Sequence, residues 1–324
     1  MKIHLTFAKG IYCQVNYNSL FFIFVLCFLN IFCGFSQVIG NQGKIYFISD
    51  VQSPLPVEKI HLKGYRNEEA RNKLFEDLLL LHPDNLFILG DLVSRGSDEK
   101  AWADLDTFLN SLSRGNTHLY VIPGNHEYMG RLSAGIQTYK YHFQEKWLYG
   151  NSVKIDSIAI VSLNSNFNKL SENELSKQLK WYEAEMNSLD SDPSIKGIIV
   201  CTHHAPYSNS KAVGSSELVQ KLIIPDFEKS RKSILFMSGH SHNLEYFSDS
   251  INKHFLVIGG GGGLTQPLLP VSKGKYHDLL GQDSKPVYFY LVIEKEGNNL
   301  KLMARGFKKD FNFFEFIIGI LHFE

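Results

Sequence analysis

Short apolar runs alternate with longer stretches of helical periodicity in the first part of the chain. The runs at 43–50, 85–91 and 118–123 have the length and the β-branched and aromatic content of buried strands. Between them, 67–82 and 99–112 carry apolar residues at helical spacing, as expected of helices that pack on a sheet. This alternation predicts parallel βαβ units, whose ligands gather at the carboxyl ends of the strands.

The pattern becomes hairpin-like in the last part of the chain. Before that change, helices are predicted at 134–147 and 172–189, and strands at 153–164, 195–202 and 233–238. The hairpin-like strands are predicted at 244–247, 254–258, 287–293 and 300–305. Because antiparallel strands follow a parallel half, we expect an α/β fold with two packed mixed sheets and helices outside, a four-layer α/β/β/α sandwich.

The N-terminal residues 1–36 have the composition of a secretory signal peptide. They contain Lys2 and Lys9, no acidic residue and the apolar stretch 20–29, and they end in the small-x-small pattern Gly34-Phe35-Ser36 of a cleavage site. An uncleaved membrane anchor is the alternative, but the segment 20–35 has 16 residues, short of the roughly 20 that span a bilayer. We therefore expect cleavage near Ser36, export to the periplasm or the extracellular space, and no stable membrane span afterwards.

The remaining chain is expected to form one globular domain over 37–310. With 324 residues, 44% of them hydrophobic, the chain is long and apolar enough for a large core. The tail 311–324 is strongly apolar but too short to span a membrane. An edge strand and a disturbed reading frame both account for it, and the sequence does not decide between them.

Charge and cysteine content exclude some classes of function. Loss of Lys2 and Lys9 would leave 31 basic against 33 acidic residues, so we expect no polymeric nucleic acid as a partner. Cys201 would be the one cysteine left, which excludes an internal disulfide. Its place in an apolar run favours a buried strand residue over a thiol nucleophile beside His203.

Polar side chains follow five of the predicted strands. Successive strand residues face opposite sides of a sheet, whereas a corner between strand and loop can direct neighbouring side chains into one cleft. A lone histidine or Gly-Asp pair is usually structural, but five such corners along one chain indicate a site. The corners carry Asp50 with Gln52, Gly90 with Asp91, Asn125 with His126 and Glu127, His203 with His204, and His240 with His242.

This order of corners resembles the calcineurin-like metallophosphoesterases of the purple acid phosphatase-like superfamily. The family's blocks are Asp-x-His, Gly-Asp, Gly-Asn-His-Asp/Glu, a lone His after a strand, and Gly-His-x-His. The resemblance extends over roughly 44–263 and departs in the first block, where Gln52 takes the place of a histidine. It implies a hydrolase that cleaves mono- or diesters of phosphate in small substrates, with a metal-bridging hydroxide at a dinuclear site, and the signal-peptide composition adds the expectation of export.

The resemblance also implies a role for each matching side chain. Asp91 would bridge two metal ions, which could be Mn, Fe, Zn or Mg. The first metal would be held by Asp50, Asp91 and His242, and the second by Asp91, Asn125, His203 and His240. His126 would lie near the leaving oxygen, with Glu127 orienting it. His203 fits the lone-histidine block better than His204 because of the turn that follows.

Gln52 weakens the match at the first metal. A neutral amide oxygen is a weaker ligand than imidazole, so the first position should be harder, weaker or partly open, and Ser94 occupies the place of a tyrosine ligand found in one family branch. The alternative function is therefore a catalytically weakened or inactive protein that keeps the fold and binds a ligand. Arg95 could contact phosphate or simply be an exposed loop residue.

Three loops are expected near the site. The stretches 127–150 and 264–286 are the least patterned between strands, so we expect them to line the substrate entrance. The five glycines at 259–263 lack the Gly-Lys-Ser/Thr of a phosphate-binding P-loop. We expect them instead to let the backbone pass close to the site.

Overall fold

The computed structural model describes residues 43–55, 66–143, 148–280 and 285–323. The expected signal peptide lies outside these ranges. Within them, no helix is both long enough and apolar enough to cross a bilayer.

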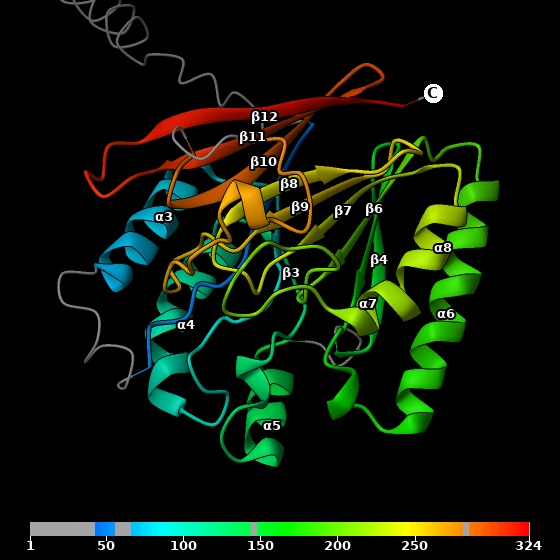
Figure 1. Cartoon of the computed structure of the whole chain (residues 1–324). Coiled ribbons are helices and arrows are strands. Elements are labelled where there is room, and N and C mark those ends of the chain that lie inside the picture. The colour runs from blue at the N-terminus through cyan, green and yellow to red at the C-terminus, as the bar shows by residue number, and fades with distance from the viewer. Residues whose placement is uncertain (1–42, 56–65, 144–147, 281–284, 324) are drawn as a thin grey trace, which may run out of the picture. The chain divides into compact units, whose positions relative to one another are not determined.

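Two six-stranded sheets pack face to face and carry helices on their outer faces (Figure 1). Helices α3 (Asn67–Leu81) and α4 (Glu99–Arg114) cover the first sheet, and α6 (Glu172–Ser191) covers the second. The predicted four-layer α/β/β/α sandwich is therefore confirmed. The shorter helices are α5 (Leu132–His142), α7 (Glu217–Leu222), α8 (Ile224–Lys229), η1 (His126–Tyr128), η3 (Phe167–Lys169) and η4 (Val271–Lys273).

The first sheet has the order β12-β11-β10-β1-β2-β3. Strands β1, β2 and β3 are parallel. On the other side of β1, strands β10, β11 and β12 follow one another in antiparallel pairs, as the change of pattern along the chain predicts. Its strands are β1 (Lys44–Ile48), β2 (Asn85–Ile88), β3 (His118–Val121), β10 (Tyr288–Glu296), β11 (Asn299–Phe307) and β12 (Phe314–His322).

The second sheet has the order β4-β5-β6-β7-β9-β8, with a parallel centre and an antiparallel strand at each edge. Its strands are β4 (Gly150–Ile155), β5 (Ile158–Leu163), β6 (Gly197–Thr202), β7 (Ser233–Ser238), β8 (Leu244–Ser248) and β9 (His254–Ile258). The stretch expected as strand at 153–164 is a hairpin, because Asp156 turns the chain with a φ of 51°.

Side-chain alternation along the strands explains the layers. In β1, Ile45 and Phe47 face the core between the sheets, whereas Tyr46 and Ile48 face α3 and α4. Cys201 of β6 is fully buried between the sheets, which confirms it as a structural strand residue.

The apolar tail forms β12, an edge strand paired with β11 along its length. Ile318 and Leu321 are buried against the inter-sheet core, while Ile317 and Ile320 are exposed. Of the two readings of the tail that the sequence left open, the structure therefore has the edge strand.

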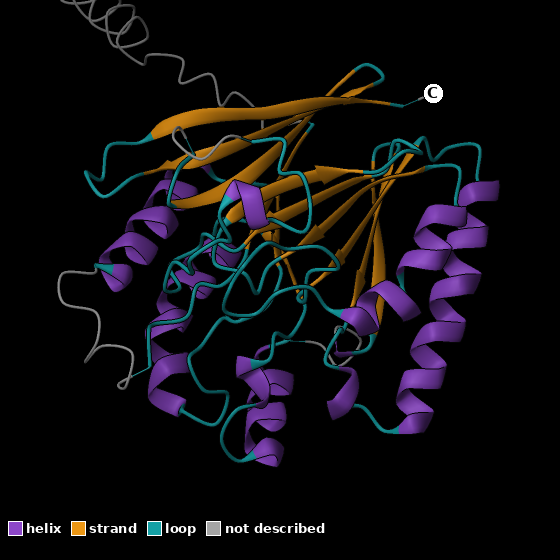
Figure 2. Cartoon of the chain, in the orientation of Figure 1, coloured by secondary structure: helices purple, strands orange, loops and turns teal. Residues whose placement is uncertain are grey.

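The carboxyl ends of the parallel strands of both sheets lead into one region of loops (Figure 2). Several hydrogen bonds join the corners of the two sheets there. His203 Nδ1, after β6, lies 2.8 Å from the Leu89 carbonyl oxygen after β2, and Asn166 Nδ2, after β5, donates to the Pro123 carbonyl oxygen at 3.0 Å. The polar corners predicted from the sequence thus converge between the two sheets.

Candidate metal centre

Three site residues adopt a left-handed backbone conformation directly after their strands. The φ angles of Asp50, Asp91 and His240 are 61°, 54° and 65°. Non-glycine residues rarely adopt such angles, and surrounding contacts must hold them there. Asp50 and His240 hold each other in this conformation, because the His240 backbone N–H donates to both oxygens of the Asp50 carboxylate, at 3.1 and 3.0 Å.

Two glycines allow the carboxylates to approach the backbone of neighbouring corners. A Cβ atom at Gly124 would overlap Asp91 Oδ1, and one at Gly239 would overlap Ser49 Oγ and Asp50 Oδ2. These are the glycines of the Gly-Asn-His-Glu and Gly-His-x-His corners. This chain needs glycine at both positions because a side chain would collide with a carboxylate of the site.

A first group of donor atoms combines Asp50, Asp91 and His242, whose ligand atoms all lie within 4.8 Å of one another. His242 Nε2 is 3.4 Å from Asp50 Oδ1. Gln52, which is 4% exposed, joins the group, because its Nε2 lies 3.3 Å from Asp91 Oδ2 and 3.3 Å from His242 Nε2. Gln52 therefore occupies the place at which the resemblance puts a histidine ligand.

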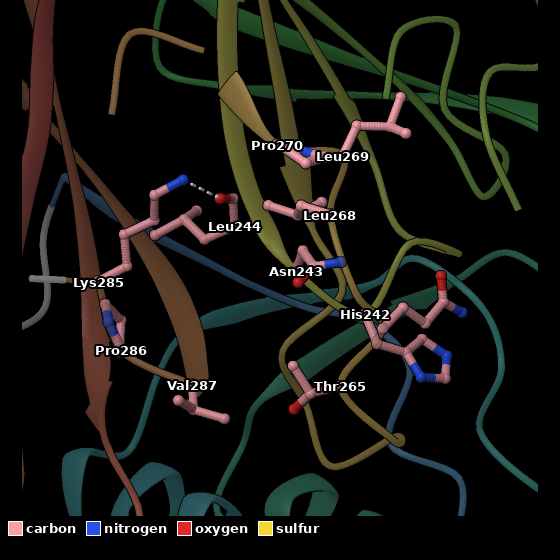
Figure 3. A pocket seen from close by; sticks show the side chains of 11 residues that line it. His242, Asn243, Leu244, Thr265, Leu268, Leu269, Pro270, Lys285, Pro286 and Val287 are labelled. Atoms are coloured by element: carbon pink, nitrogen blue, oxygen red, sulfur yellow. Dashed lines mark hydrogen bonds between the residues drawn. The ribbon is translucent and has the colours of Figure 1, made fainter. Parts of the chain in front are cut away.

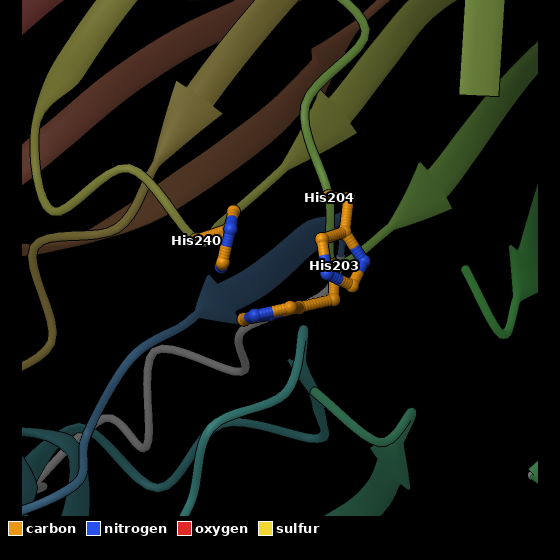
Figure 4. Close-up of side chains that lie close together, drawn as sticks. All are labelled: His203, His204 and His240. Atoms are coloured by element: carbon orange, nitrogen blue, oxygen red, sulfur yellow. The ribbon is translucent and has the colours of Figure 1, made fainter. Parts of the chain in front are cut away.

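A second group combines His203, His204 and His240, also within 4.8 Å of one another (Figure 4). His203 Nε2 lies 3.3 Å from Asp91 Oδ2 and 3.1 Å from Asn125 Oδ1. Asp91 thus lies between the two groups, in the position of a bridging carboxylate. The structure brings together every ligand suggested by the sequence.

Backbone carbonyls orient three of the imidazoles. The Nδ1 atoms of His203, His242 and His126 lie 2.8, 2.6 and 2.8 Å from carbonyl oxygens of Leu89, Leu264 and Ser94, respectively. A carbonyl oxygen only accepts hydrogen bonds, so each Nδ1 carries the proton. When His203 and His242 are neutral, their Nε2 atoms therefore carry the lone pairs that face the centre, as in metal-bound histidines.

Opposite charges stabilise one another at the centre of the site. Burial alone would raise the pKa of the Asp91 carboxyl, but the imidazoles of His203 and His126 hold it well below its usual range. Burial alone would lower the pKa of His203, but Asp91 raises it to about 9. The buried carboxylate therefore requires positive charge beside it, which two metal ions would supply in the loaded protein.

The other two histidines of the second group are neutral at neutral pH. Burial, and next the nearby charge of His203, lower the pKa of His204 and of His240 to about 3 each. Neutral imidazoles are the form that binds metal.

The expectation that Glu127 orients His126 is wrong. Glu127 is fully buried, and its carboxylate accepts hydrogen bonds from the backbone N–H groups of Asp91, Leu92, Val93 and Gly124, at 3.0, 2.8, 3.3 and 2.6 Å. Burial and the charge of Asp91 raise the pKa of Glu127 to about 7, although these donors lower it. Glu127 joins two corners of the site, while His126 is oriented by Ser94.

The donor set and one orphaned atom fit a bound metal. Carboxylate, amide and imidazole donors together suit Mn, Fe, Zn or Mg. Gln52 Oε1 is buried and has no hydrogen-bond partner among the residues that the structure describes. An orphaned buried oxygen is costly, and a metal ion would satisfy it.

The glycine-rich loop and the loop of Arg95 border the centre. Gly261 N donates to the Ser49 carbonyl oxygen and Gly263 N to that of Asp50, so the glycine-rich loop passes beside the site as expected. Arg95 is exposed, which matches the simpler of its two interpretations.

A cavity of about 480 Å³ adjoins the centre at His242 (Figure 3). Its walls come largely from 264–270 and 285–287, including Leu268 and Val287. Figure 3 shows the His242 ring directed away from these walls. That 264–286 lines the substrate entrance therefore stays a prediction.

Sequence reasoning missed the residues after β5. Ser165 Oγ lies 2.8 Å from His204 Nδ1 and accepts the His204 backbone N–H at 2.9 Å. A polar corner after an apolar strand could have found them, because Asn164, Ser165 and Asn166 directly follow the apolar strand 158–163.

Comparison with known proteins identifies the class that this fold and centre define. The profile of the calcineurin-like phosphoesterase family matches residues 43–244, and the chain therefore belongs to this family. Among curated proteins, tartrate-resistant acid phosphatase type 5 of Sus scrofa is 22% identical over 208 residues. That match covers 57% of this chain and 58% of the relative, so it spans less than two thirds of the relative's length.

Solved structures with the same fold include three with distant sequences. Purple acid phosphatase PPD1 of Lupinus luteus has a TM-score of 0.61 and 16% identity, covering 85% of this chain and 53% of that one. GAP50, described as the anchor in the inner membrane complex of Plasmodium, has a TM-score of 0.58 and 14% identity, covering 87% and 88%. A dimetal phosphatase of Danio rerio has a TM-score of 0.53 and 13% identity, covering 86% and 99%.

Proposed function

We propose that this protein is an exported, metal-dependent phosphoesterase that hydrolyses mono- or diesters of phosphate at a dinuclear centre. The observation that carries the proposal is the position of Asp91, whose Oδ2 lies 3.3 Å from both His203 Nε2 and Gln52 Nε2, between two groups of metal-binding side chains. Membership of the phosphoesterase family supports the reaction class.

Two metal ions, when bound, would neutralise the phosphoryl oxygens and make water a nucleophile near neutral pH. Asp50, Asp91 and His242 would hold the first ion, with Gln52 beside it. Asp91 would be shared with the second ion. Asn125, His203 and His240 would complete the second position.

His126 would assist departure of the leaving group. Its backbone N–H donates to Asp91 Oδ1 at 2.9 Å, and the Ser94 carbonyl oxygen holds Nδ1, so Nε2 faces the centre, 3.8 Å from Asp91 Oδ2. When protonated, Nε2 can transfer its proton to the departing alkoxide oxygen as the ester bond breaks. Water then returns the proton to the imidazole.

The activity is tested with purified protein comprising residues 37–324. It should release nitrophenol from p-nitrophenyl phosphate or from bis-p-nitrophenyl phosphate when Mn is added, and a chelator should abolish the release. Absence of turnover with each of Mn, Fe, Zn, Mg and Co would contradict the proposed function.

A ligand-binding protein without turnover is the second candidate. Gln52, which replaces a ligand in the first group, supports it, as does the fold shared with GAP50, which is described as an anchor. Elemental analysis separates the candidates. Two metals per chain favour catalysis, whereas one or none, together with inactivity on both esters, favours binding.

Export rests on the composition of residues 1–36. N-terminal sequencing of the protein recovered outside the cytoplasm should begin at or near Gln37. Recovery of the chain only inside the cell, with these residues intact, would contradict export.

A further inference from the structure

His204 is a third imidazole at the second metal position. Its ring centroid lies 4.5 Å from that of His240 and 5.0 Å from that of His203, and the residue comes from the same corner as His203 (Figure 4). The three donor nitrogens lie within 4.8 Å of one another. Nitrogens bound to one zinc ion lie about 3.3 Å apart, since each Zn–N bond measures about 2.0–2.1 Å, so a small contraction would bring all three to a single ion.

Ser165 orients the His204 ring for such a role. The Ser165 hydroxyl is fixed by the His204 backbone N–H at 2.9 Å and lies 2.8 Å from Nδ1 of the ring. Ser165 is 5% exposed, so the contact is sheltered from water. With Nδ1–H donating to this oxygen, Nε2 offers its lone pair, the arrangement by which outer partners usually hold ligating histidines.

We propose that His204 is an additional ligand of the metal position formed by His203 and His240, which makes the two positions of the centre chemically unequal. The proposal rests on the proposed dinuclear centre. The second position becomes rich in imidazole nitrogen, whereas the first, with Asp50, Asp91 and the Gln52 amide, is rich in oxygen. Imidazole suits Zn, Cu, Fe and Ni, and oxygen donors suit Mg and Mn, so the nitrogen-rich position should bind zinc first and more tightly.

The test is metal binding by residues 37–324 after removal of metals by dialysis against a chelator. Zinc added by equilibrium dialysis should occupy one tight site and one weaker site. X-ray absorption at one equivalent of zinc should show three imidazole nitrogens. Two imidazoles at that equivalent in the wild-type protein would overturn the proposal without need of any variant.

His204→Asn is the matching variant, because the shorter amide can still reach Ser165 while the inward nitrogen is removed. It should weaken the tight site by roughly 10-fold or more and leave the weak site unchanged, and Ser165→Ala should weaken the tight site by less than His204→Asn does, because Ser165 acts only through the imidazole. His118→Ala, at an exposed strand end, is the control and should change neither. Thermal unfolding without metal shows whether each variant folds.

The outcomes separate the two proposals. A folded His204→Asn variant with wild-type zinc affinity would show that His204 only packs against His240, while two bound metals would leave the phosphoesterase proposal intact. No zinc bound by the wild-type protein would contradict the dinuclear centre itself.

Discussion

The two donor groups of the centre differ in chemistry and in origin. The first draws Asp50, Gln52 and Asp91 from the corners after β1 and β2 of one sheet, and only His242 comes from the other. The second is built from histidines that follow β6 and β7. One sheet thus supplies mainly oxygen donors and the other mainly imidazoles, so a metal ion that suits one group is not the ion that best suits the other.

Asp91 is common to both groups, and its replacement should have the largest effect. Asp91→Asn removes the charge that His203 and His126 face and the second oxygen ligand of a bridge. We expect loss of both metals in elemental analysis and loss of ester hydrolysis to background. Asp310→Asn, on the surface, is the control. Retention of two metals by Asp91→Asn would show that Asp91 bridges nothing.

His126 should affect chemistry without affecting either group. His126→Ala should keep the metal content and lose roughly 10²- to 10⁴-fold in rate on an alkyl phosphate. The loss should be smaller on a nitrophenyl ester, whose leaving group needs less protonation, whereas His203→Ala should lose metal and activity on both. Equal slowing of both esters, or an empty second position, would mean that His126 is a structural residue or a ligand.

Glu127 should affect both groups through the backbone. The carboxylate of Glu127 accepts hydrogen bonds from backbone N–H groups. In Glu127→Gln the side-chain NH₂, itself a donor, would face some of these N–H groups and leave them unpaired. We therefore expect the free energy of unfolding to fall by roughly 3 kcal/mol. Denaturant unfolding of the metal-free protein measures this. A change below about 1 kcal/mol would show that these hydrogen bonds contribute little net stability.

Replacement of Gln52 should change metal binding at the first group alone, and its effect should be the smallest of these four. Gln52→His replaces a weak amide donor with imidazole, so zinc affinity should rise at the weak site and remain unchanged at the tight one. Equilibrium dialysis of zinc reads both sites in one experiment. Unchanged binding at both would place Gln52 outside the metal's reach.

Corners that follow strong apolar runs were predictable from sequence. The layers, the parallel halves and the convergence of Asp50, Asp91 and His203 all follow from strands whose carboxyl ends share one edge. The family resemblance then suggested which polar residue at each corner binds metal. Gln52, which the resemblance put in the place of a histidine ligand, lies beside Asp91 and His242, and whether it binds metal stays a prediction.

Contacts that depend on loop conformation were not predictable. Glu127 adjoins His126 in sequence, yet the short η1 turn directs its carboxylate to the N–H groups of the 91–93 loop. The partnership of Ser165 with His204 joins residues 39 positions apart, and no periodic pattern reports it. The tail was ambiguous because an apolar edge strand lacks the alternation that marks a half-buried one, and both faces of β12 carry isoleucine.

Anomalous diffraction from crystals equilibrated with zinc tests the central claim most directly. We predict one peak among His203, His204 and His240 at one equivalent of zinc. At excess zinc a second peak should appear about 3.5–4 Å away, between Asp50 and His242, with Asp91 between the two. Equal peaks at one equivalent would contradict unequal positions, and no peak beside Asp91 at any concentration would contradict the metal centre.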